Sequence, residues 1–136
     1  IISLSSDKSA ANRIIAFSGR ATNDQPYRDG GLASRGDGLV GDVNGDGFQD
    51  LLIQAGFANG GGTDSGEAYL VLGRNASDWS ALGGTTGDFS LLNTSLANRV
   101  FRFIGREANS NFSYGATPGL GDINGDGFDD FLIGAM

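Results

Sequence analysis

The sequence predicts an all-β protein, and three observations support that prediction. Short apolar runs alternate with Gly-rich turns along the chain, which is typical of β-strands joined by tight connections. Glycine accounts for 24 of the 136 residues, without the triplet period of collagen. A nine-residue acidic segment occurs twice, 80 residues apart, and an apolar run follows each copy. The repetition also indicates that the fold is built from repeated units.

The acidic segment spans residues 42–50 and 122–130. Both copies have oxygen-bearing side chains at positions 1, 3, 5 and 9 and glycine at positions 4 and 6. Glycine adopts the positive φ angles of a tightly curved loop, so alternate side chains can turn their oxygens inward. Three carboxylates, one amide and the position 7 carbonyl suit Ca²⁺, which accepts about 6–8 oxygens in irregular geometry. We therefore expect two calcium sites, with the ligands Asp42, Asn44, Asp46, Phe48 (carbonyl) and Asp50, and Asp122, Asn124, Asp126, Phe128 (carbonyl) and Asp130.

Two alternatives to these sites can be weighed on the sequence. A turn rich in Gly, Asp and Asn forms without any metal, but two copies in register favour calcium. An EF-hand or dockerin loop needs a bidentate acid at position 12, where this chain has Ile53 and Ile133. The loops are therefore expected to lead into buried strands. The rings of Phe48 and Phe128 are expected to turn into the protein, and Asp129 is expected to be solvated.

The other strands are predicted from β-favouring residue types between glycines. In one of them, Phe101 and Phe103 share a face, and Arg102 is expected to point to solvent and protect a sheet edge. Residues 74–98 form a longer excursion. The expected strands are residues 1–5, 13–19, 30–33, 50–55, 67–73 and 99–105. One repeat period then contains four strands, as does one blade of a β-propeller.

Residues 112–115, 121–130 and 131–135 resemble the FG-GAP repeat, the unit of the integrin α-chain N-terminal β-propeller and of its bacterial relatives. The family's run is, loosely, Phe-Gly, then Gly-Asp-x-Asn-x-Asp-Gly-x-x-Asp, then Gly-Ala-Pro. The first copy follows it less closely, since residues 35–38 look inserted and Gln-Ala-Gly at 54–56 replaces Gly-Ala-Pro. The resemblance implies four-stranded antiparallel blades of the β-propeller type, with strands A (inner) to D (outer) and a calcium loop between A and B.

On this resemblance the chain is one unit of about two repeats. Residues 30–105 form a full blade, residues 112–136 supply strands A and B of a half blade, and residues 1–19 supply strands C and D of a preceding blade. In the full blade, strand A is expected near 30–40, B at 50–56, C at 67–73 and D at 100–105.

So few blades cannot close a ring, and open edges pair with other chains. Two explanations stay open. The chain is a fragment of a longer propeller, or the N-terminal strands of one protomer complete the half blade of an identical neighbour, head to tail.

Composition excludes several function classes. Sixteen acidic and nine basic residues give a net charge of −7, so nucleic acid is not an expected partner. The absence of Cys and His excludes disulfides, thiolate or imidazole metal sites, and acid–base chemistry by histidine. No apolar run is long enough to insert into a membrane. We expect no enzyme, because the paired carboxylates belong to the metal loops. Weak calcium loops suit the millimolar calcium found outside the cytosol, at an extracellular or cell-surface location.

The expected function is therefore a non-catalytic structural or adhesive module that binds protein chains or a glycan or matrix ligand. Trp79 and Tyr69 can stack on a sugar, although packing is the commoner role of such aromatics. Residues 35–37 spell Arg-Gly-Asp, which chance explains in so glycine-rich a chain. The alternatives are a self-assembling filament or surface-layer subunit and an accessory domain of a secreted enzyme. Three glycosylation sequons begin at Asn75, Asn93 and Asn111.

Overall fold

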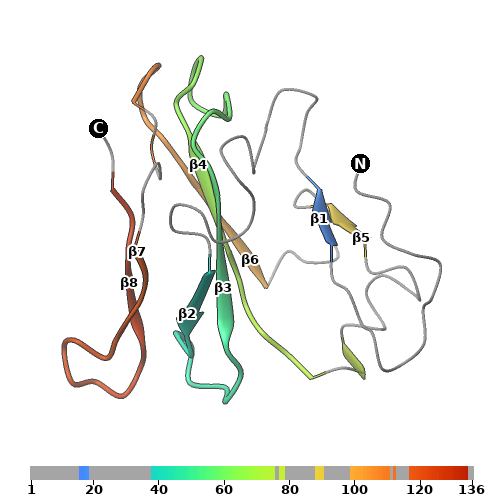
Figure 1. The fold of residues 1–136 in the computed structure, drawn as a ribbon, viewed down its shortest axis with the longest axis vertical. Helices are drawn as coiled ribbons and strands as arrows, with labels where there is room; N and C mark the ends of the chain where they lie inside the picture. The colour runs from blue at the N-terminus through green and yellow to red at the C-terminus, as the bar shows by residue number, and fades with distance from the viewer. Residues whose placement is uncertain are drawn as a thin grey trace.

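The computed structural model describes residues 16–18, 38–75, 77–78, 88–90, 99–110, 112 and 117–134. These residues form two antiparallel sheets and one parallel strand pair, which lie side by side in Figure 1. The all-β prediction is confirmed. No helix within these residues is long and apolar enough to cross a membrane. The strands are β1 (Ala16–Ser18), β2 (Gly38–Gly41), β3 (Asp50–Ala55), β4 (Glu67–Val71), β5 (Asp88–Ser90), β6 (Val100–Ile104), β7 (Thr117–Gly121) and β8 (Asp130–Leu132).

The central sheet has four antiparallel strands in the order β2-β3-β4-β6. This order is that of strands A to D in a propeller-type blade. β2 pairs with β3 and β3 with β4, each the next strand in the chain, whereas β4 pairs with β6 because β5 belongs to the parallel pair. The inner strand begins at Gly38, inside the range expected for strand A, while residues 30–33 lie outside the described residues.

The two faces of the four-stranded sheet carry separate apolar clusters, because successive side chains of a strand point to opposite faces. On one face, Val40, Leu52 and Leu70 are buried and pack against side chains of the half blade. On the other face, Ile53 and Val71 are buried in a second cluster. A propeller blade likewise needs two apolar faces, one for each neighbour.

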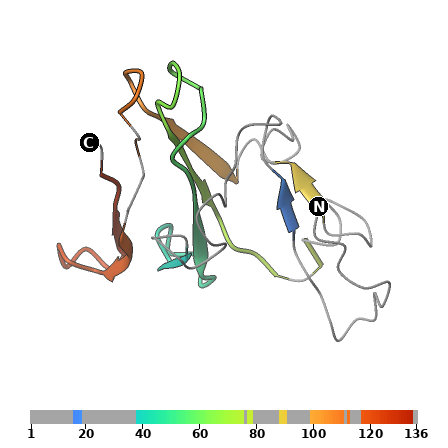
Figure 2. The same ribbon diagram turned by 45° about the horizontal axis from the view of Figure 1, so that its top comes forward.

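The half blade consists of β7 and β8, which pair antiparallel around the second acidic loop. β7 lies against β2, and Gly119 approaches the backbone of Leu39 and Val40 so closely that a Cβ there would lie 3.1–3.2 Å from it. The two acidic loops lie at the same end of the molecule in both ribbon views (Figures 1 and 2).

Strand β1 lies within residues 13–19, but its described partner is β5, from the 74–98 excursion, and the pairing is parallel. Figure 1 places this pair on the side of the central sheet opposite to the half blade. Residues 1–5, the expected partner of 13–19, lie outside the described residues. The assignment of residues 1–19 to a preceding blade therefore stays a prediction.

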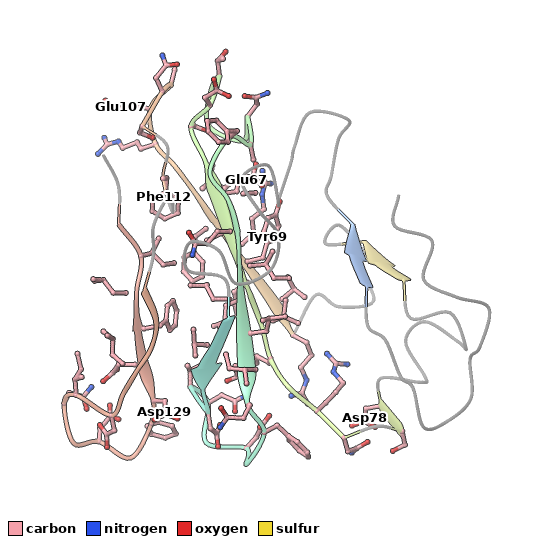
Figure 3. All side chains as sticks on the ribbon, viewed as in Figure 1. Glu67, Tyr69, Asp78, Glu107, Phe112 and Asp129 are labelled. Carbon is pink, nitrogen blue, oxygen red and sulfur yellow. The ribbon has the colours of Figure 1, made fainter. Side chains whose placement is uncertain are left out.

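Arg102 is half-buried and paired with Glu67, so the expectation that it points to solvent and protects a sheet edge is wrong. It lies opposite Tyr69 in the register of β4 and β6. Its Nε and Nη2 donate to the two carboxylate oxygens of Glu67 at 2.7 and 2.5 Å, and the Tyr69 hydroxyl also donates to that carboxylate. Glu67, labelled beside Tyr69 in Figure 3, is fully buried. The bidentate contact from Arg102 therefore compensates a carboxylate charge that is shielded from water. Alternation puts Arg102 on the face opposite to Phe103, but it cannot reveal that this face is covered.

Candidate metal centre

Both acidic loops adopt the curvature that their glycines allow. Gly45 and Gly47 have φ angles of +73° and +86°, and Gly125 and Gly127 have +77° and +93°. Positive φ is readily available to glycine and costly for most other residues. The two glycines thus bend the chain sharply between strands A and B of each repeat.

In the first loop, side-chain oxygens accept hydrogen bonds from the loop's own backbone. The Asp42 carboxylate accepts from the N–H groups of Asp46 at 3.0 Å and Gly47 at 2.7 Å. The Asn44 Oδ1 also accepts from the Asp46 N–H at 3.0 Å, and the Asp46 Oδ1 accepts from the Phe48 N–H at 3.0 Å. The backbone thereby directs three oxygen-bearing side chains into the loop.

The second loop repeats these bonds. Asp122 accepts from the N–H groups of Asp126 at 3.0 Å and Gly127 at 2.8 Å. Asn124 and Asp126 repeat the contacts of their counterparts at 2.9 and 3.0 Å. The structure therefore brings the predicted side chains of each site together in one loop, with matching local geometry.

Asp50 and Asp130, at position 9, tie the end of each loop back to its beginning. Asp50 is fully buried and accepts from the N–H of Val43 at 2.9 Å and from that of Gly73, just beyond β4, at 2.7 Å. Asp130 accepts from the Ile123 N–H at 3.0 Å and is only half-buried. The first loop is thus held by strand C of its own blade as well as by itself.

Burial raises the pKa of Asp50, and the two N–H donors from Gly73 and Val43 oppose that rise. The charges of Asp46 and Asp42 raise the pKa further. The negative charges of Asp42 and Asp46 thus repel the buried carboxylate of Asp50. A bound cation would offset that repulsion.

Two exposed loop aspartates, Asp46 and Asp122, have lowered pKa values. The hydrogen bond from Asn44, followed by that from the Phe48 N–H, lowers the pKa of Asp46. The Arg99 Nη1 lies 3.3 Å from the Asp46 Oδ2. For Asp122, the N–H of Gly127 is the main cause of a lowered pKa. Both carboxylates are therefore held in their charged form.

The side chains of the two acidic loops carry the ligand atoms that a hard cation prefers, but they would have to rearrange locally to bind one. Their donors are carboxylate, amide and carbonyl oxygens, the set that Ca²⁺ prefers. Within the described residues, no group of three or more acidic side chains is arranged to hold a metal ion. The Asp46 carboxylate is turned to Asn44, whose Nδ2 donates to it at 3.0 Å, and to Arg99. Binding a metal ion there would break the hydrogen bond between Asn44 and Asp46.

The model of the FG-GAP repeat family matches residues 36–71 and 114–136. These matches are consistent with about two FG-GAP repeats in the chain. The first match covers β2, its loop, β3 and β4, and the second covers β7, its loop and β8. FG-GAP is a β-propeller repeat, so the four-stranded sheet is a propeller-type blade. Searches of curated proteins and of solved structures gave no match.

Asp129 of the second FG-GAP repeat is a site residue that the sequence does not reveal. Its Oδ2 accepts from the Asp42 N–H at 2.8 Å, and its own N–H donates to the Asp42 carbonyl at 3.1 Å. Figure 3 shows Asp129 at the end of the half blade where the second acidic loop lies. The expectation that Asp129 is solvated is therefore wrong. The first repeat has Gln49 at this position, so a comparison of the two repeats does not identify Asp129 as a contact residue.

The phenylalanine rings of the two FG-GAP loops do not turn into the interior, contrary to expectation. Phe48 is 39% exposed and Phe128 44% exposed. The Phe128 ring lies against Gly45 of the first loop, where a Cβ would collide with it. Phe128 and Asp129 together thus connect the second FG-GAP loop to the first.

The remaining predicted residues fall outside this centre. Asn75 is exposed, and its Oδ1 accepts from the Asp78 N–H at 2.9 Å. Tyr69 is buried, which suits packing and not sugar stacking. The other candidates lie outside the described residues: Asn93, Asn111, Trp79 and residues 35–37.

Proposed function

We propose that the chain is a calcium-stabilised FG-GAP β-propeller module with a non-catalytic structural or adhesive role outside the cell. The observation that supports this most strongly is the pair of matching acidic loops. Both have the same pattern of backbone-held carboxylates, and both lie at one end of the molecule. Carboxylate and amide oxygens at this repeated spacing are ligands of the kind that Ca²⁺ accepts.

Calcium would supply two positive charges and a coordination centre for the loop oxygens. The chain contributes the ligands and the surrounding rigidity. Asp42 bonds both to its own loop and to Asp129 of the next repeat, so ordering one loop orders the contact between the blades. The module would then present its surface loops at a fixed angle to a protein, glycan or matrix partner.

Thermal unfolding with and without the chelator EGTA tests this function. We expect EGTA to lower the Tm of the chain, and Asp46→Ala and Asp126→Ala each to reduce the size of that effect. Asp78→Ala, which removes an exposed acid outside both loops, serves as the control and should leave the EGTA effect unchanged. An identical Tm in calcium and in EGTA would show that calcium has no structural role.

Head-to-tail self-assembly is a second candidate, which the half blade favours. Among the described strands, β8 pairs with β7 alone, so its other edge is open to an incoming strand. The N-terminal strands of an identical protomer would complete that sheet. We expect such a chain to sediment as a polymer and to become monomeric when residues 1–19 are deleted. A monomer at all concentrations excludes this candidate.

A further inference from the structure

Asn-Gly pairs are chemically labile, because the glycine nitrogen can attack the asparagine side chain with no Cβ in the way. The sequence contains three such pairs, which are Asn44-Gly45, Asn59-Gly60 and Asn124-Gly125. The first and the third lie in seven-residue segments that differ only by Val43 in place of Ile123. A difference in reactivity between these two pairs must therefore come from the fold.

The structure arranges both reacting groups of the pair at residues 124 and 125. The Asn124 Oδ1 accepts from the Asp126 N–H at 2.9 Å, which folds the side-chain amide over the intervening peptide. The Gly125 N–H donates to the Asp122 Oδ1 at 2.7 Å. The attacking nitrogen thus lies beside a carboxylate that can accept its proton, and an N–H donor holds the oxygen of the attacked carbonyl.

The first acidic loop has only half of this arrangement. The Asn44 Oδ1 accepts from the Asp46 N–H at 3.0 Å, as in the second loop. The carboxylate at loop position 1, however, accepts from the N–H groups of positions 5 and 6. Among the described residues, no carboxylate accepts the Gly45 N–H, so the attacking nitrogen of this pair has no base beside it.

Packing separates the two loops further. The Phe128 ring lies against Gly45, where a Cβ would collide with it, whereas no atom of the described residues lies within 4 Å of a Cβ at Gly125. Asn44 is half-buried and Asn124 is exposed. Because cyclisation needs the glycine peptide to rotate and hydrolysis needs water, packing hinders both steps in the first loop.

The pair at residues 59 and 60 is held differently. The Asn59 Oδ1 accepts from the Asp64 N–H at 2.7 Å, five residues further on, so its amide is not folded over the next peptide by the contact seen at residue 124. A Cβ at Gly60 would collide with the paired side chains of Glu67 and Arg102. The buried ion pair therefore restrains the backbone that would have to rotate.

We propose that Asn124 is a site of spontaneous deamidation in the folded chain, whereas Asn44 and Asn59 are protected. The Gly125 nitrogen forms a bond to the Asn124 Cγ, and its proton passes by way of Asp122 to the amide nitrogen, which leaves as ammonia. Water then opens the resulting succinimide at either carbonyl and gives aspartate or isoaspartate. The net reaction consumes water and releases ammonia, so it needs no other reactant.

The modification changes a loop that already carries Asp122, Asp126 and Asp130. Both products add a negative charge to it. Isoaspartate also inserts a methylene group into the main chain between loop positions 3 and 4, which displaces the positions that follow. The inference goes beyond the proposed function and does not depend on calcium, so the reaction is tested in EGTA.

The test incubates the chain in EGTA at neutral pH and follows the three Asn-Gly pairs by peptide mapping with mass spectrometry. We expect Asn124 to deamidate at least about fivefold faster than Asn44 or Asn59. In urea, Asn44 and Asn124 should react at equal rates, because their neighbours in sequence are nearly identical. Equal rates at these two residues in the folded chain, or a selectivity that persists in urea, overturn the inference.

A matched pair of variants tests the role of the carboxylate. Asp122→Asn keeps the shape of the side chain but removes the base, so the rate at Asn124 should fall by about threefold or more. Asp42→Asn makes the same change in the first loop, where the carboxylate does not contact the glycine nitrogen, and should leave the rate at Asn44 unchanged. Circular dichroism checks that both variants fold. A rate at Asn124 that Asp122→Asn does not alter also overturns the inference.

Discussion

At the residue scale, the two position 9 aspartates differ more than their sequence suggests. Asp50 is fully buried and satisfies the N–H groups of Val43 and Gly73, whereas Asp130 is half-buried. Leaving a buried donor unsatisfied costs about 1–3 kcal/mol. In EGTA, we expect Asp50→Ala to lower the free energy of unfolding by about 2–4 kcal/mol and Asp130→Ala by about 1 kcal/mol. Urea denaturation measures both, and equal losses would contradict the anchoring role of Asp50.

The buried Glu67 gives a second residue-scale prediction, which does not involve calcium. Removing one partner of a buried ion pair leaves an uncompensated charge and costs about 3–5 kcal/mol. We therefore expect Arg102→Ala to destabilise the chain by that amount and Glu67→Gln with Arg102→Met to restore part of the loss. Arg106→Ala is the control, since Arg106 is exposed. A cost near zero for Arg102→Ala would show that water reaches Glu67.

These residues also show what a sequence can reveal. The loop aspartates are predictable because their spacing repeats and because few residue types form that pattern. Asp129 and Arg102 are not, since their partners Asp42 and Glu67 are distant in sequence and depend on how strands and blades pack.

At the element scale, the two loops behave as one connected unit. Asp129 holds the backbone N–H of Asp42, a predicted ligand of the first site. In an Asp126→Ala background, which isolates the first site, we expect Asp129→Ala to weaken its calcium affinity by about fivefold, equivalent to about 1 kcal/mol. Gln49→Ala changes the exposed counterpart and should leave that affinity unchanged. Equal effects of the two variants would show that the loops bind independently.

The strands were predictable to the extent that their residues are apolar and bounded by turns. β3, β4 and β6 fall in the expected ranges because each forms a continuous β-favouring run. β5 was not expected, since it is three residues long within a polar excursion. Its parallel pairing with β1 joins segments far apart in the chain, which local pattern cannot reveal.

At the scale of the whole molecule, one full blade and one half blade pack through a shared apolar cluster, and calcium is proposed to fix their angle. The repeat spacing predicted this architecture. It did not predict that the half blade leaves Leu132 and Ile123 exposed, because exposure depends on which blade is present to cover them.

Calorimetric titration of the metal-free chain with calcium tests the central claim most directly. The account predicts two calcium ions bound per chain, one per chain for Asp46→Ala or Asp126→Ala, and none for the double variant. Absence of binding at millimolar calcium, or a stoichiometry that neither substitution changes, would contradict it.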